Sequence, residues 1–180
     1  MAMDYILRGV PPKVDPIGPE NVLVFAGRPL TGTAISGQSR MSVNCKSPLS
    51  GLIGDAQVGR FFPAELKMAG FDAVVVKGKS PFPVYLWIKD GQYELRDASR
   101  YWGMGTGTFE DTIQAELGDS KLQTWSPGCF REHPVMLILV SSSMESCTEG
   151  RTTRRANLVI SLSVGSSSGR TATGKATWRN

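Results

Sequence analysis

The sequence predicts an α+β fold with two β-sheets, short helices and an irregular C-terminal tail. Three observations predict it: apolar runs of strand length, a hairpin signature, and two helical patterns, all within the first 123 of 180 residues. The hairpin signature is Asp90-Gly91 between runs at 84–89 and 92–96, because this dipeptide suits the left-handed torsions of a two-residue type I′ turn. With 41% hydrophobic and 20% charged residues, the chain suits one soluble domain or a piece of a larger one.

Three further runs predict strands. Residues 21–26 are largely apolar and stop at Gly27, and residues 41–45 alternate before a turn-rich string. Residues 72–76 contain a continuous Ala-Val-Val-Val core, which is typical of a strand buried on both faces. These strands and the hairpin supply enough sequence for two sheets.

A first short helix is expected from Pro63 to Gly70. Proline is favoured in the first helical turn and glycine just past the last one. We expect Glu65 and Lys67, both within this helix, to be solvated.

A second helix is expected before Gly118. Phe109, Ile113 and Leu117 recur at four-residue spacing and share one helical face. Thr108 with Asp111 three positions later resembles a capping box, which predicts that the helix begins there.

The tail has a different composition. Residues 1–123 contain 13 Lys or Arg and 13 Asp or Glu, whereas residues 124–180 contain seven basic and three acidic residues and three serine clusters. The apolar islands at 135–140 and 158–160 favour strands. From residue 165 onward little can be buried, so disorder is expected over the last sixteen residues.

Composition also excludes several classes of protein. The longest apolar run, 135–140, is far shorter than the roughly 20 residues of a membrane helix, and no secretory signal is apparent, so we expect a cytoplasmic protein. Cys45, Cys129 and Cys147 form no C-x-x-C pair and His133 is the single histidine, which argues against a disulfide framework, a zinc site or a cluster site. The basic tail residues are scattered without aromatic platforms, so no nucleic-acid partner is expected.

Four segments rich in Gly, Ser and Thr lie between the first strands, at 29–33, 36–40, 47–51 and 54–59. Small residues let backbone N–H groups approach a flat or anionic ligand, so these loops are either a cofactor cradle or ordinary turns. Arg40 ends the second segment, where its planar fork of donors suits a phosphate, although a surface charge is the simpler interpretation.

Six strings in the first part of the chain carry a family resemblance. They are D-P-I-G-P-E-N-V-L at 15–23, P-L-T-G-T at 29–33, K-S-P-L-S-G at 46–51, A-E-L-K-M-A-G-F-D-A-V-V-V-K-G-K at 64–79, P-V-Y-L at 83–86 and R-D-A-S-R-Y-W-G at 96–103. In this order and spacing the chain resembles the N-terminal domain of the aldehyde:ferredoxin oxidoreductase family of tungsten enzymes. The resemblance is specific for the family and says little about the substrate.

The resemblance implies that the two sheets form a platform for a tungsten bis-pterin cofactor. At matching positions, Arg40 would contact a pterin phosphate, Gln57 would help to hold a magnesium ion (Mg) that bridges the two pterin phosphates, and Gly59 would pack on the cofactor. The family's residue at position 57 is Asn, and the longer Gln displaces the amide oxygen by about one bond length. No residue in this chain matches a catalytic acid or base.

The chain also departs from the family pattern. Arg28, Ser39 and Arg60 stand where many members have glycine, and the family's upstream Gly-Arg-Gly segment and its cysteine ligands for a 4Fe-4S cluster are absent. Beyond Leu122 the expected G-P-A-G-E-N string is replaced by T-W-S-P-G-C-F-R-E-H-P. We therefore expect an incomplete pterin-binding domain at 1–123 and a divergent, partly disordered tail at 124–180 that is translated out of frame, with natural divergence as the alternative.

The resemblance implies a function for the complete protein. It would oxidise small aldehydes to carboxylic acids and pass the electrons through the pterin and a 4Fe-4S cluster to ferredoxin, with no membrane partner and with homo-oligomerisation and the choice of tungsten over molybdenum left open. The alternatives are a fragment of a tungsten-type benzoyl-CoA reductase catalytic subunit and a noncatalytic remnant. In each case the isolated chain is expected to be inactive.

Overall fold

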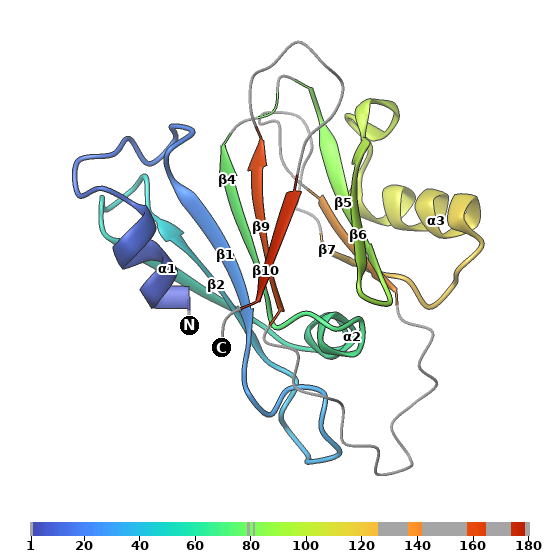
Figure 1. The fold of residues 1–180 in the computed structure, drawn as a ribbon. Coiled ribbons are helices and arrows are strands. Elements are labelled where there is room, and N and C mark those ends of the chain that lie inside the picture. The colour runs from blue at the N-terminus through green and yellow to red at the C-terminus, as the bar shows by residue number, and fades with distance from the viewer. Residues whose placement is uncertain are drawn as a thin grey trace.

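The computed structural model describes residues 2–78, 80 and 82–125, and the backbone of three strands in the tail. Three α-helices, one 3-10 helix and ten strands follow one another along these parts of the chain (Figure 1). In chain order they are α1 (Ala2–Gly9), β1 (Val22–Gly27), β2 (Met41–Lys46), β3 (Ile53–Val58), α2 (Phe62–Met68), β4 (Ala73–Gly78), β5 (Val84–Lys89), β6 (Gln92–Asp97), η1 (Ser99–Tyr101), α3 (Thr106–Leu117), β7 (Gln123–Trp125), β8 (Leu137–Ser141), β9 (Leu158–Val164) and β10 (Gly174–Trp178).

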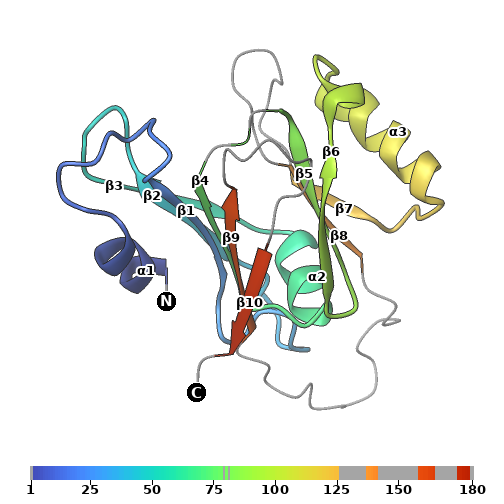
Figure 2. The same cartoon turned by 45° about the horizontal axis from the view of Figure 1, so that its top comes forward.

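The strands form two sheets, so the predicted α+β fold with two sheets is confirmed. The first sheet has the order β10-β9-β4-β1-β2-β3 and the second the order β6-β5-β8-β7. Neighbouring strands are antiparallel except for β4 with β9 and β5 with β8, which are parallel. Helix α2 lies between the sheets, α1 covers the outer side of the first and α3 the outer side of the second (Figure 2).

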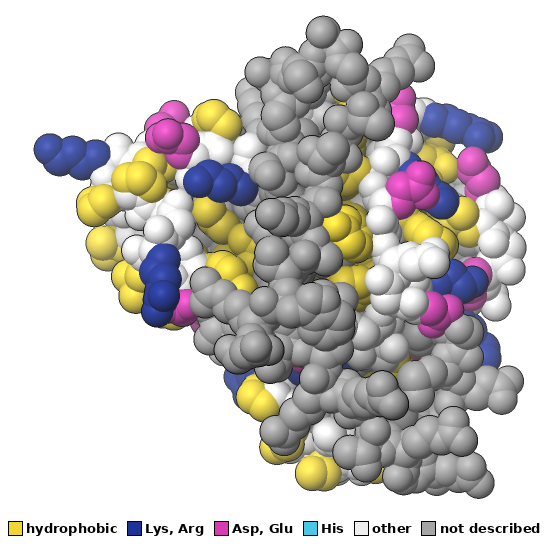
Figure 3. Space-filling model, in the orientation of Figure 1, with side chains coloured by type: hydrophobic (Ala, Val, Ile, Leu, Met, Phe, Trp, Pro, Cys, Tyr) yellow, Lys and Arg dark blue, Asp and Glu magenta, His cyan; other side chains and the backbone are white. Residues whose placement is uncertain are grey.

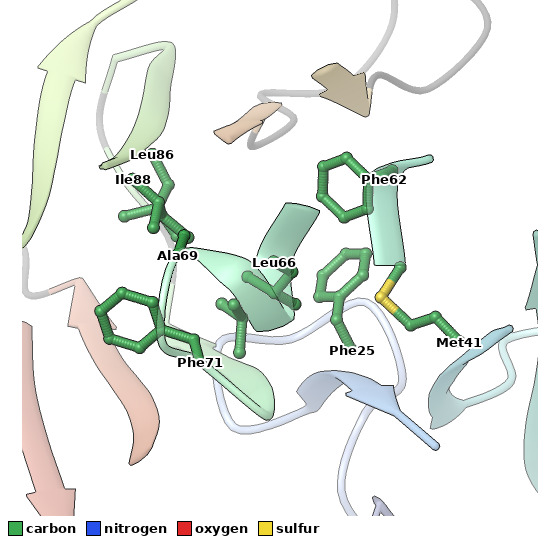
Figure 4. Close-up of a cluster of buried hydrophobic side chains, with 9 residues drawn as sticks. Phe25, Met41, Phe62, Leu66, Ala69, Phe71, Leu86 and Ile88 are labelled. Atoms are coloured by element: carbon green, nitrogen blue, oxygen red, sulfur yellow. The ribbon is translucent and has the colours of Figure 1, made fainter. Parts of the chain in front are cut away.

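The main core lies where α2 meets both sheets. The strand residues Phe25, Met41 and Val74 come from the first sheet and Leu86 and Ile88 from the second. Phe62 and Leu66 of α2, with its C-cap Ala69 and the following Phe71, fill the space between them (Figure 4). This apolar contact fixes the position of α2, which also forms one wall of the cavity described below.

The local patterns of the first 123 residues are largely confirmed. The runs at 21–26, 41–45 and 72–76 correspond to β1, β2 and β4, and Ala73, Val74 and Val75 are buried as expected. Asp90 and Gly91 have φ angles of 46° and 81°, which are the left-handed torsions that the hairpin requires. Both predicted helices are present, and α3 ends at Gly118 in the left-handed conformation.

Two local predictions are wrong. The segment 54–59, expected as a loop, is mostly the edge strand β3, whose exposed side chains give no alternation of polar and apolar residues. Helix α3 begins at Thr106 with Gly105 as its N-cap and no side-chain cap, so Thr108 is no capping residue. Instead the Thr108 carbonyl accepts a hydrogen bond of 2.6 Å from Thr112 Oγ1.

The tail strands extend both sheets. Strands β8 and β9 confirm the two apolar islands as strands. Within the last sixteen residues the structure differs from the expected disorder, because Gly174–Trp178 pairs with β9 over five positions. A strand needs only a partner with free backbone groups, and β9 supplies one despite the polar composition of this segment. In the described part of the chain, no helix reaches the length and apolarity of a membrane span.

Candidate cofactor site

A cavity of about 580 Å³ lies at the end of the first sheet where the 28–40 loop joins β1 to β2. Three segments line it: residues of the loop between Gly32 and Arg40, the pair Gly59-Arg60 just after β3, and Ala64 and Met68 of α2. Two of the three predicted cofactor residues, Arg40 and Gly59, are therefore brought together. Gln57 does not line the cavity.

Hydrogen bonds within the loop hold Arg40 at the cavity. Thr31 is only 4% exposed, and its Oγ1 lies 2.9 Å from the carbonyl oxygens of both Gln38 and Arg40. The Arg28 amide donates to the same Arg40 carbonyl over 3.2 Å. Because these bonds fix the backbone, the exposed Arg40 side chain extends from a defined position.

Glycines shape the cavity wall. A Cβ added at Gly59 would lie 3.3 Å from the Ser39 carbonyl oxygen, so the two segments approach too closely for a side chain to fit comfortably. Gly37 has a φ of 76° and a Cβ there would meet nothing within 4 Å, which leaves its backbone open to a ligand. These positions have the small-residue character expected of a surface for a flat cofactor.

Two arginines give the cavity a positive charge. Arg40 and Arg60 both line it, and neither forms an ion pair with another described residue. Arg60 has a left-handed φ of 69°, which a residue with a side chain adopts at a cost. Ser39 Oγ donates to the Arg60 carbonyl and helps to hold this conformation. A phosphate group is the kind of ligand that these donors suit.

Gln57 lies in β3, opposite Ser42 of β2, and its side chain is exposed. Its Oε1 accepts a hydrogen bond of 3.1 Å from Arg28 Nη2. Two residues earlier, Asp55 Oδ1 accepts a hydrogen bond of 2.6 Å from Asn44 Nδ2. No group of three His, Cys, Asp or Glu side chains suited to a metal occurs in the residues the structure describes. The Gln57 Oε1 atom that would bind magnesium is thus already hydrogen-bonded to the Arg28 guanidinium. The side chains around it therefore do not fit a magnesium ion.

The third glycine-rich segment is not part of the cavity. Residues 47–51 form the turn between β2 and β3, where the Gly51 amide donates to the Ser47 carbonyl. Arg40 and Gly59 lie at the opposite end of that hairpin, about 20 Å away for a six-residue strand. The expectation that all four segments meet is wrong, because antiparallel pairing places successive connections at opposite ends of the strands.

One buried ion pair near the cavity was not expected. Lys67 Nζ donates to Asp72 Oδ1, and the two side chains are 18% and 12% exposed, so the prediction that Lys67 is solvated is wrong. The Lys67 stem also passes close to two glycines, with its Cε 3.2 Å from a Cβ built at Gly27 and its Cβ 3.4 Å from one built at Gly32. This ion pair fixes the wall behind the glycines.

Away from the cavity, two groups have raised pKa values for structural reasons. Burial, followed by the hydrogen bond of 2.7 Å that its hydroxyl donates to Glu116 Oε2, raises the pKa of Tyr101. Burial raises the pKa of the Cys45 thiol, which disfavours the reactive thiolate. Cys129, Cys147 and His133 lie outside the described residues.

Comparison with known proteins places this geometry in a family. The family described as aldehyde ferredoxin oxidoreductase, N-terminal domain, matches residues 1–156, past the expected boundary at 123. Tungsten-containing aldehyde ferredoxin oxidoreductases of Pyrococcus abyssi and Pyrococcus furiosus are 44% and 47% identical over 77% and 75% of this chain. These stretches make up only 23% and 22% of the relatives, so the chain spans about a quarter of their length.

A solved structure supports the same assignment. The active-site complex of benzoyl-coenzyme A reductase with 1,5-dienoyl-CoA aligns with a TM-score of 0.73 and 30% identity, covering 80% of this chain and 26% of that one. Because the family match spans residues 1–156, which is most of the chain, the chain belongs to the aldehyde ferredoxin oxidoreductase family, as part of its N-terminal domain.

Proposed function

We propose that this chain cradles the pterin cofactor in a tungsten oxidoreductase that oxidises aldehydes to carboxylic acids and passes electrons to ferredoxin. The observation that carries the proposal is the cavity in which Arg40 and Gly59 meet an open glycine, Gly37. The tungsten content of the relatives and their names, which include aldehyde and ferredoxin, support the rest.

The residues of the cavity fit a phosphorylated pterin. Gly37 offers open backbone at which a flat ring can lie closely, Gly59 lines the same cavity, and Arg40 offers two parallel donors to a phosphate. When bound, a tungsten bis-pterin would supply the oxidation chemistry and the path for electrons. This chain's own contribution is to bind the phosphate and to orient the ring.

We expect the isolated chain to be inactive and to retain neither tungsten nor iron. The part of the chain that the structure describes offers no metal-ligating group of three side chains, so a 4Fe-4S cluster needs ligands from elsewhere. Metal analysis of the purified chain checks this expectation. Stoichiometric tungsten or iron would contradict it.

The cradle is tested by titrating 6-hydroxymethylpterin and its phosphate ester into a solution of the chain. Fluorescence measures the affinity for each pterin. We expect the phosphate ester to bind about 10- to 100-fold more tightly, because one charge-assisted contact contributes about 1.5–3 kcal/mol. Arg40→Ala should remove this preference while leaving the unphosphorylated pterin unaffected. Arg100→Ala, which removes an exposed arginine from η1, is the matched control. Equal affinities for the two pterins would contradict the cradle.

A second candidate function rests on the solved neighbour. The likeness to a benzoyl-coenzyme A reductase complex favours reduction of an aromatic ring on the same platform. The higher identity to the aldehyde enzymes, 44% and 47%, favours aldehyde oxidation. Assay of the complete protein with benzoyl-CoA and with small aldehydes would separate the two, and inactivity with both would support a noncatalytic remnant.

We also propose that the tail after residue 123 is read out of frame. Its excess of Arg, Ser and Thr and the loss of the G-P-A-G-E-N string at 124–134 support this, whereas the family match that continues to residue 156 favours natural divergence. Sequencing of the gene on both sides of this region is the test. An in-frame continuation of the family sequence in another reading frame is expected, and its absence would favour natural divergence.

A further inference from the structure

We propose that the Arg28 guanidinium, held by Gln57, stands in for a divalent cation beside the cavity, so that this chain binds a phosphorylated ligand without a metal. The inference rests on the proposed cradle, because it needs an anion at Arg40. Its basis is the hydrogen bond of 3.1 Å from Arg28 Nη2 to Gln57 Oε1.

The hydrogen bond crosses a whole strand. Arg28 directly follows β1, Gln57 belongs to β3, and β2 lies between them in the sheet. Two inter-strand spacings are about 9.5 Å, which the Arg28 side chain, the hydrogen bond and the Gln57 side chain span together. The Arg28 guanidinium therefore lies across the end of the sheet rather than pointing away from it.

The hydrogen bond between Arg28 and Gln57 leaves only N–H donor groups of these two side chains for a ligand. A guanidinium has five N–H donors and no acceptor, so the Gln57 amide must present its oxygen to Arg28 and keep its NH₂ group for other partners. With one guanidinium donor engaged, four remain. A hard cation seeks oxygen ligands and would have to displace Arg28, whereas phosphate oxygens accept from donors of this kind.

Arg40 lies within reach of the same ligand. Ser42 pairs with Gln57 in the sheet, and Arg40 is two residues before Ser42, on the same face of the strand by alternation. The Arg28 amide also donates to the Arg40 carbonyl over 3.2 Å, so the two backbones are adjacent. Two arginines thus stand at one end of the sheet, and we expect both guanidinium groups to reach a single diphosphate.

The neighbouring carboxylate does not cancel this charge. Asp55 lies on the Gln57 face of β3, but its carboxylate accepts a hydrogen bond of 2.6 Å from Asn44 Nδ2 and forms no ion pair with a described arginine. Neither Arg28 nor Arg40 forms an ion pair among the residues described. The positive charge is therefore available to an anion.

The test is titration calorimetry of the full chain with inorganic pyrophosphate, in EDTA and with added Mg²⁺. We expect binding in EDTA that added Mg²⁺ does not tighten. Arg28→Ala should weaken it about 10- to 100-fold, as expected for one charge-assisted contact, and Arg28→Lys should recover only part of the loss. Arg100→Ala, with the same change of net charge, should bind as the unchanged chain does, and the circular dichroism of each variant controls for folding.

Two results would overturn the inference while leaving the cradle intact. One is pyrophosphate binding that requires Mg²⁺, and the other is a loss of affinity in Arg40→Ala with none in Arg28→Ala. If pyrophosphate does not bind the unchanged chain in either buffer, the inference is wrong, and the titration with the two pterins then decides on the cradle separately.

Discussion

The two ends of the described structure follow opposite packing rules. At α3, the side chains of Tyr85, Tyr101, Phe109, Ile113 and Leu122 form a closed apolar cluster in which each is at most 6% exposed. At the cavity, Ile35 in its lining remains 57% exposed, and Leu30 and Phe61 in the segments that lead into the lining remain 47% and 70% exposed. Over α3 and β6 basic and acidic side chains are interspersed (Figure 3), whereas Arg40 and Arg60 at the cavity have no acidic partner among the described residues.

This contrast separates stability from binding. A close-packed cluster loses transfer energy and leaves a void when a side chain is truncated, so changes there lower the free energy of unfolding. An open loop surface with unpaired charge has little packing to lose, so changes there act mainly on the affinity for a ligand. The following substitutions exploit this difference.

The largest difference in stability is expected between two phenylalanine-to-alanine substitutions, one in the closed cluster and one beside the cavity. Phe109 is fully buried, with its ring centroid 5.2 Å from that of Tyr101, so Phe109→Ala should lower the free energy of unfolding by about 3–5 kcal/mol. Phe61→Ala removes the same side chain from a 70% exposed position and should change it by less than about 0.5 kcal/mol. Urea unfolding measures both, and similar losses would refute the contrast.

The next effect is expected at a buried hydroxyl of the cavity loop. Thr31→Val keeps the shape but removes the donor to the Gln38 and Arg40 carbonyls, so the free energy of unfolding should fall by about 1–3 kcal/mol. Pyrophosphate affinity should fall as well, because Arg40 loses its fixed backbone. The control is Thr33→Val, whose exposed hydroxyl bonds only its own turn at Leu30. Equal effects of the two variants on affinity would contradict the role of Thr31.

A gain in stability is expected where the cavity stores backbone strain. Arg60 has a φ of 69°, and glycine adopts this conformation without the steric cost. Arg60→Gly should therefore raise the free energy of unfolding by about 1 kcal/mol. Arg100→Gly, within η1, should lower it by about 0.5–1 kcal/mol, since glycine only adds flexibility there. A loss in both variants would mean that Arg60 is not strained.

The elements that were predictable from sequence are those with local signals. The Asp90-Gly91 turn and the spacing of Phe109 and Ile113 lie within a few residues, so the hairpin and α3 follow from pattern alone. Strand β3 was missed because it lies at the sheet edge with both faces largely exposed, and such a strand has no alternation to detect. Helix α1 was not predicted.

The site was only partly predictable because its contacts are long-range. The resemblance identified Arg40 and Gly59, and the structure brings them to one cavity. The Arg28 hydrogen bond to Gln57 joins residues 29 positions apart, and no spacing rule reveals which partner a side chain meets across an intervening strand. The pairing of Lys67 with Asp72 depends likewise on how α2 packs before β4.

The smallest effect is expected from titration of Tyr101 in the closed cluster. Burial and the hydrogen bond to Glu116 raise its pKa, so in alkaline solution the unfolded chain loses this proton first. Its stabilising contribution is fully present below the ordinary tyrosine pKa of about 10 and declines as the pH rises above that value. The stability advantage of the unchanged chain over Tyr101→Phe should therefore shrink in urea unfolding between about pH 9 and 11. A constant difference would show that the folded and unfolded chains lose this proton at the same pH. Tyr101 would then be as open to water as the cavity arginines, and the contrast between the two ends would fail.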